Sequence, residues 1–113
     1  MRDNIIKTKS FNFALLYQYL NEMKREFILS KQLLRSGTSI GANIRESEHG
    51  QSKSDFIHKL SISLKEANES DYWLDLLFQS NYLDELQYNS LKTDIQELIK
   101  LLVSIIKSSK NNL

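Results

Sequence analysis

RSGTSIGANIRESEHG, residues 35–50, places small residues where the surrounding pattern predicts a helix. Glycine and small hydroxylated residues are poor helix formers, so packing must compensate for their presence. Two stripes with the three- and four-residue spacing of a helical face run through this region. One is apolar (Leu33, Gly37, Ile40, Ile44), and the other is small and polar (Gln32, Ser36, Ser39, Asn43, Glu46). Because small side chains allow close approach, we expect a second helix to pack against this backbone.

The partner expected for this stripe is the following helix, in which SLKEANESDYWL places polar residues on one face. We expect Asn43 to hydrogen-bond to a group such as Glu66 or Glu69, since buried amides need partners. The contact lies between helices two and three or between subunits, and the alternative is a solvated polar face. The predicted helix-contact and polar network comprises Ser36, Gly37, Ser39, Gly41, Asn43, Glu66 and Glu69.

Helical periodicity continues almost throughout the chain and predicts four helices, near residues 10–22, 26–49, 53–80 and 85–110. Gly50 is expected to form a left-handed cap of the second helix. Ser52 and Asp55 form a capping box for the third. Short connections and no strand signal indicate an all-α, antiparallel up-down-up-down four-helix bundle. We expect residues 1–113 to form this single domain.

Composition narrows the class of protein. The chain of 113 residues has no cysteine, which excludes disulfides and thiolate metal sites, and no proline, which favours long helices. No long apolar run marks a signal peptide or a transmembrane helix, so a cytoplasmic location is expected.

The apolar residues of the last predicted helix cover a wider arc around its axis than one bundle face requires. A regular seam of leucines and isoleucines is joined by further apolar residues, which widen the arc to about 200°. We interpret the excess as a subunit interface of a homo-oligomer. The alternative is a cover formed by the N-terminal segment through Ile5 and Ile6. The candidate interface residues are Ile99, Leu101, Val103 and Ile106.

The stretches SKQLLRSGTSIGANIRESE and SKSDFIHKLSISLKEANESDYWL resemble the four-helix bundle family of 23S rRNA-intervening sequence proteins, to which accessory proteins of diversity-generating retroelements are related. The match is closest over about residues 30–74. The string Ser39-Ile40-Gly41-Ala42-Asn43-Ile44 is its most specific part, and Arg45-Glu46-Ser47 and Glu69-Ser70 depart mildly from the family pattern. The resemblance implies a non-enzymatic ring, a pentamer, that associates with RNA or DNA or with a reverse transcriptase or other nucleic-acid enzyme.

Charge is distributed unevenly along the chain. Residues 1–35 carry seven basic and three acidic side chains, a net charge of +4, whereas residues 36–70 and 71–113 sum to −1 and −2. A basic face hints at an anionic partner, although a folded bundle can also mix these charges in space. The candidate nucleic-acid-binding residues are Lys24, Arg25, Lys31 and Arg35, with Lys7 or Lys9 adjacent. Binding of this kind would be directed at the backbone and sensitive to salt.

Motifs for catalysis are weak. Glu46 and His49 form a single Glu-x-x-His, whereas di-metal carboxylate bundles use two such motifs with two more glutamates. The segment from Gly37 to Gly41 lacks the Lys-Ser/Thr ending of a phosphate loop, and no nucleophile elbow is present. We therefore predict no enzyme activity, no metal and no cofactor. A protein-binding scaffold without nucleic-acid contact is the alternative, and a metal-carboxylate enzyme is a distant third.

Overall fold

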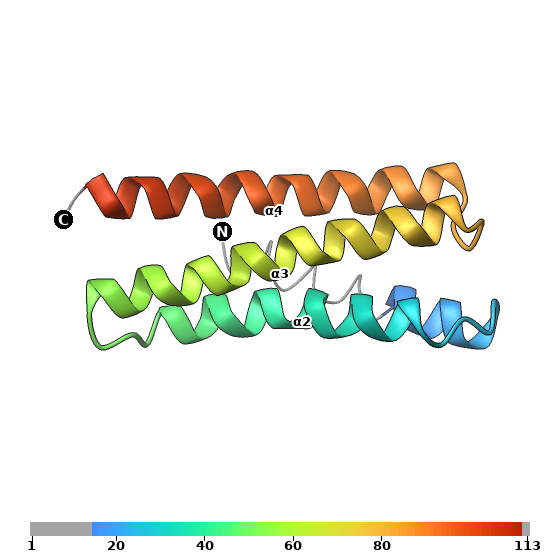
Figure 1. Cartoon of the computed structure of the whole chain (residues 1–113), viewed down its shortest axis with the longest axis horizontal. Helices are drawn as coiled ribbons and strands as arrows, with labels where there is room; N and C mark the ends of the chain where they lie inside the picture. Colours follow the sequence, from blue (N-terminus) through green and yellow to red (C-terminus); the bar gives the residue numbers. More distant parts are fainter. Residues whose placement is uncertain (1–14, 112–113) are drawn as a thin grey trace.

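The structure is a computed structural model that describes residues 15–111, which form helices joined by turns, with no strand. A helical segment over residues 15–22 precedes α2 (Leu29–Ser47), α3 (Lys53–Gln79) and α4 (Glu85–Asn111). Figure 1 shows each long helix running opposite to the one before it. The antiparallel all-α fold is therefore confirmed. Outside the described residues lie several residues of the sequence predictions: Ile5, Ile6, Lys7, Lys9 and the helix start near Ser10.

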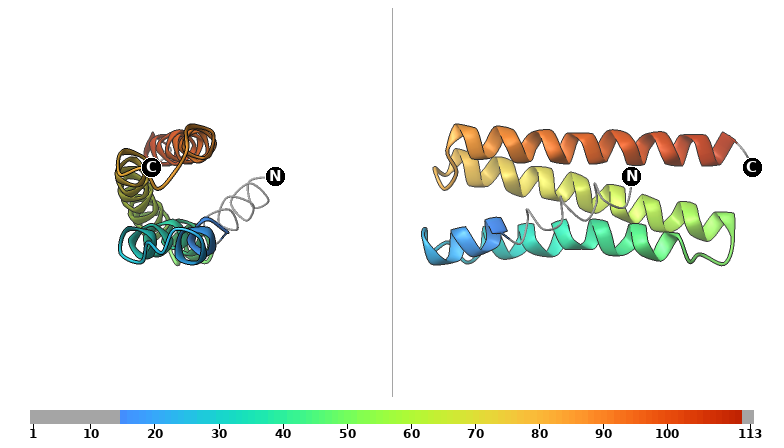
Figure 2. Two further views of the ribbon diagram at one scale, coloured as in Figure 1. Left: turned by 90° about the vertical axis from the view of Figure 1, so that its right-hand side faces the viewer. Right: turned by 180° about the vertical axis from the view of Figure 1, so that it is seen from behind.

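α3 is the central element, because it packs against both α2 and α4. The end-on view in Figure 2 shows α3 at the corner between the other two long helices. Two clusters of buried side chains fill the interior, and Ile99 packs against both. The first cluster consists of Leu16, Leu20, Leu33, Leu74, Leu77, Leu83 and Ile95. The second consists of Ile40, Ile44, Leu60, Ala67, Leu98, Leu102 and Ile106.

The small-residue segment is helical and packs closely against α3, as predicted. Ser63 of α3 donates its hydroxyl to the backbone carbonyl of Ile40 at 2.8 Å. The hydroxyl groups of Ser36 and Ser70 lie 2.7 Å apart across the same contact. Between these two bridges Ala67 is fully buried. A side chain that bonds a carbonyl inside a neighbouring helix requires the close approach that small residues permit.

The predicted partner of Asn43 is wrong. Its amide donates to the carbonyl of Ser39 in the same helix at 2.9 Å. Glu66 and Glu69 instead face Arg35, at 3.5 and 2.9 Å from its guanidinium. A long guanidinium reaches across the helix contact and forms charge-assisted bonds, whereas the short amide finds a carbonyl one turn away.

The glycines do not all serve the roles that the sequence indicates. Gly37 is buried and Gly41 is half-buried, but the hydrogen bonds across the α2–α3 contact come from Ser36, Ser63 and Ser70. The left-handed cap predicted at Gly50 is wrong, because no glycine in residues 15–111 has a positive φ. A Cβ at Gly50 would lie 3.1 Å from the Ser47 carbonyl oxygen and 3.3 Å from the Phe56 nitrogen. Glycine therefore allows the chain to pass close to the start of α3.

The starts of α3 and α4 are fixed by side-chain caps. The Ser52 hydroxyl accepts the Asp55 N–H at 3.0 Å, as predicted, and the Asp55 carboxylate accepts the Gln51 N–H at 3.3 Å. At α4 the Asp84 carboxylate accepts the Gln87 N–H at 2.7 Å, and the Gln87 amide oxygen accepts the Asp84 N–H at 3.0 Å. These contacts satisfy N–H groups that have no partner within the helix.

The α3–α4 contact contains a network of charged groups. Lys92 Nζ lies 2.6 Å from Asp71 Oδ1 and 3.0 Å from Asp75 Oδ1, and the Tyr88 hydroxyl donates to Asp75 at 2.6 Å. Burial raises the pKa of Asp75, but the bonds from Tyr88 and Lys92 outweigh it, so the net pKa is lowered. Phe78 and Tyr88 stack with their ring centroids 4.1 Å apart.

The four interface candidates on α4 do not form one exposed surface, which corrects the prediction. Ile106 is buried, Ile99 packs against both core clusters, and Leu101 is half-buried. Val103 is 46% exposed. At 3.6 residues per turn, Leu101 and Val103 lie about 200° apart around the helix axis. Of the four candidates only Val103 is exposed, because the others pack wholly or partly within the fold.

Candidate functional site

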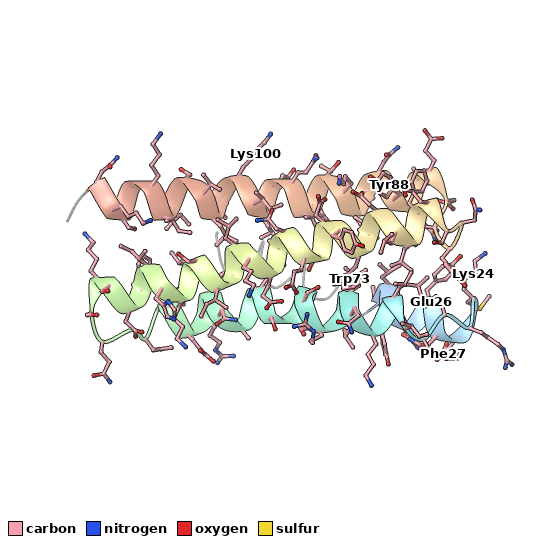
Figure 3. All side chains as sticks on the ribbon, viewed as in Figure 1. Lys24, Glu26, Phe27, Trp73, Tyr88 and Lys100 are labelled. Atoms are coloured by element: carbon pink, nitrogen blue, oxygen red, sulfur yellow. The ribbon has the colours of Figure 1, made fainter. Side chains whose placement is uncertain are left out.

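The connection between residues 22 and 29 brings cationic and apolar side chains to one end of the bundle. Figure 3 shows Lys24, Glu26 and Phe27 at this end, where the connection between α3 and α4 also lies. The helix over residues 15–22 ends as the Met23 N–H donates to the Tyr19 carbonyl at 2.9 Å. Arg25 then adopts a left-handed conformation with φ of 52° and reverses the chain.

Glu26 fixes this connection from inside. The side chain is buried, and its carboxylate accepts the backbone N–H groups of Ile28, Leu29 and Ser30 at 3.1, 3.0 and 2.6 Å. The Ser30 hydroxyl also donates to the Glu26 carbonyl at 2.7 Å. Burial raises the pKa of Glu26, but these N–H donors outweigh it and hold the pKa below its ordinary value. Glu26 therefore caps α2, which begins at Leu29 and not near residue 26 as predicted.

Apolar side chains around Glu26 point outward. Met23, Phe27 and Ile28 are 71%, 56% and 75% exposed. A buried carboxylate beside three exposed apolar side chains inverts the usual distribution of polarity. Neighbouring apolar side chains that stay in water within a fixed turn mark an interaction surface. We call Met23, Lys24, Arg25, Phe27, Ile28 and Lys31 the end surface.

The basic residues of the end surface are available to a ligand. Lys24, Arg25 and Lys31 are exposed and form no ion pair with any residue in the range 15–111. Lys24 and Arg25 precede α2, whereas Lys31 lies in its first turn. Arg35 does not belong with them, because its guanidinium pairs with Glu66 and Glu69.

A concave region separate from the end surface lies on α3, beside Arg35 of α2. It is an open groove of about 710 Å³, and Tyr72 and Trp73 meet edge to face there with centroids 5.1 Å apart. The indole Nε1 of Trp73 is buried without a hydrogen-bond partner. The lining carries two cations, Arg35 and Lys65, and one carboxylate, Glu69, which pairs with Arg35 at 2.9 Å, so its net charge is +1. Its lining residues are Arg35, Ser61, Leu64, Lys65, Asn68, Glu69, Tyr72 and Trp73.

Carboxylates and histidines do not gather into a metal-binding group within residues 15–111. Glu46, part of the Glu-x-x-His motif, pairs with Lys59 at 3.0 Å. Among the described helices, none has the length and apolar character needed to cross a bilayer.

Sequence reasoning identified Lys24, Arg25 and Lys31 but missed Met23, Phe27 and Ile28. Starting the second helix near residue 26 assigned Phe27 and Ile28 to a helical pattern instead of a turn. The missed signal is the order of residues in KREFILS, residues 24–30. In this stretch Glu26 lies two to four residues before Ile28, Leu29 and Ser30. At this spacing a carboxylate can reach the first N–H groups of a helix.

Comparison with known proteins gives a consistent result. No curated protein sequence matches the chain. A crystal structure of a protein with unknown function from the S23 ribosomal protein family, from Bacteroides thetaiotaomicron, superimposes with a TM-score of 0.92 at 50% identity. The superposition covers 95% of this chain and 99% of that one. Residues 2–104 match the family described as 23S rRNA-intervening sequence protein. The chain thus belongs to the 23S rRNA-intervening sequence protein family.

Proposed function

We propose that this protein is a non-catalytic, homo-oligomeric bundle that binds the phosphate backbone of nucleic acid through its end surface. The observation that carries the proposal is the set of three exposed cations, Lys24, Arg25 and Lys31, that no described acidic group neutralises. Cations that contact phosphates release condensed counterions, and this release favours binding. Contacts of this kind position a ligand without reading its bases.

Two further observations support the proposal. The family description links these proteins to sequences that interrupt 23S rRNA. Assembly of several copies would repeat the end surface, and linked weak sites bind one long ligand far more tightly than a single site does. Glu26 adds rigidity, because its three N–H bonds hold the connection before a ligand arrives.

A second candidate function is a scaffold that binds a partner protein. Exposed Met23, Phe27 and Ile28 favour it, since apolar and aromatic side chains dominate the binding energy of protein interfaces. The two candidates differ in salt dependence. Phosphate binding weakens steeply with added salt, whereas apolar docking does not.

The proposal is tested by fluorescence anisotropy with labelled RNA and DNA at about 50 and 200 mM salt. The variant K24Q/R25N/K31Q removes the three cations of the end surface, and asparagine tolerates the left-handed conformation at residue 25. We expect weaker binding and a salt slope reduced by about 0.7–0.9 for each lost contact, since each contact releases counterions.

The control K100Q/K107Q/K110Q removes the same charge from exposed positions of α4. Figure 3 shows Lys100 directed away from α3. Under the proposal, this control leaves binding nearly unchanged. Equal loss in both variants would indicate a response to net charge alone, and no binding by the wild type at low salt would reject nucleic-acid binding.

A further inference from the structure

Phe27 is the feature of the end surface that phosphate binding does not explain. Phe27 is 56% exposed, and Met23 and Ile28 of the same surface are more exposed still. In a duplex the bases are stacked inside and the phosphates lie outside, so an apolar ring gains little from its exterior. An unpaired strand exposes base faces that stack on aromatic side chains.

The ring is also presented by a fixed backbone. Phe27 directly follows Glu26, whose carboxylate holds the N–H groups of the three residues Ile28, Leu29 and Ser30. The Glu26 N–H donates to the Leu20 carbonyl at 2.9 Å, which anchors the other side of the turn. A ring displayed on a fixed turn loses little conformational entropy when it binds a ligand.

The charges at this end favour a narrow ligand. Lys24, Arg25 and Lys31 belong to the end surface, whereas exposed Asp84 and Glu85 lie at the start of α4, at the same end of the bundle. A broad anionic surface such as a membrane would approach both connections and meet these carboxylates. A single strand can follow the cationic connection alone, with its phosphates near the cations and its bases near the ring.

From these observations we infer that the end surface binds single-stranded nucleic acid in preference to a duplex, with Phe27 as a stacking platform. This inference rests on the proposed function and specifies its ligand class. It concerns selectivity between strand types, which the cations alone do not provide.

The test compares Phe27→Ala with wild type for binding of an unpaired labelled strand and of a duplex of the same sequence. We expect the variant to bind the unpaired strand about 5- to 100-fold more weakly, because base stacking on the ring is lost. Duplex binding should change less than about two-fold. Leu15→Ala is the control, because Leu15 is a large apolar side chain, 49% exposed, that lies outside both the end surface and the groove on α3. It should leave both affinities unchanged.

The outcomes separate the two proposals. One outcome is salt-sensitive binding that depends on the three cations but not on Phe27, with equal affinity for duplex and single strand. This outcome overturns the stacking inference and leaves the proposed function standing. Absence of any nucleic-acid binding overturns both. Binding to phosphatidylserine vesicles in place of nucleic acid would also overturn both and would assign the end surface to lipid. Phe27→Leu, which keeps an apolar side chain without a ring, should lose nearly as much affinity as Phe27→Ala.

Discussion

Glu26 is the residue on which the end surface depends. Its carboxylate replaces the usual serine or aspartate cap and accepts three backbone N–H groups from a buried position. Hydrogen bonds to a charged acceptor contribute more to stability than neutral ones do, and a buried N–H without a partner is costly. A single carboxylate therefore fixes both the start of α2 and the outward display of its apolar neighbours.

Glu26→Gln should lower the free energy of unfolding by about 1–3 kcal/mol at neutral pH, because a neutral amide accepts N–H bonds less strongly. The folded pKa of Glu26 lies below its ordinary value of 4.5. Its stabilising contribution is thus fully present above the unfolded pKa and is lost as the pH falls through the folded pKa. Urea denaturation at several pH values would measure this, and a difference between the proteins that stays constant on acidification would contradict the assignment.

At the scale of the helices, α2 and α3 are held by small residues on both sides of their contact. Two serine bridges, Ser63 to Ile40 and Ser70 to Ser36, flank fully buried Ala67. Close packing of this kind lets short side chains of one helix hydrogen-bond to the other helix directly. The volume of the side chains at the contact therefore limits how closely α2 and α3 can approach.

Ala67→Leu should destabilise the fold by about 1–3 kcal/mol, because the added volume forces α2 and α3 apart. The two serine bridges would stretch at the same time. Asn68→Leu is the control, since position 68 is exposed and leucine is a good helix former. Thermal and urea unfolding of both variants checks the prediction. A cost for Asn68→Leu as large as that for Ala67→Leu would exclude the packing explanation.

The helices and the helix contact were predictable from sequence because their signals are local or periodic. Ser52 and Asp55 lie three residues apart, as their cap requires, and the stripe of small residues repeats with the helical period. The exposure of Phe27 was not predictable in this way. It depends on α2 beginning at Leu29, which in turn depends on how deeply Glu26 is buried by the rest of the bundle. The spacing in residues 24–30 allows Glu26 to cap a helix, but which of these side chains the bundle then buries is decided by tertiary packing.

At the scale of the whole molecule, the apolar surface of α4 is mostly used within the fold. Val103 is the exposed member of the predicted interface, at 46%. Homo-oligomerisation through this helix stays a prediction, and its surface would centre on Val103 instead of on four residues.

Val103→Lys should shift the mass measured by light scattering toward the monomer, because a buried unpaired charge at an interface is costly. Lys100→Gln is the control, since it alters an exposed side chain of the same helix without adding a charge. An assembly whose mass is the same in Val103→Lys and wild type would place the interface on another face. Unaltered helical content by circular dichroism would show that the variant remains folded.

Arg25 gives the end surface an evolutionary consequence. A residue with a side chain in the left-handed conformation, φ of 52°, is strained by about 1–2 kcal/mol, which glycine would relieve. Glycine there would yield a more robust protein with one fewer positive charge. If Arg25 is retained for ligand binding, laboratory selection for thermal stability alone should favour glycine at this position. The selected variants would be more stable but would bind the ligand more weakly.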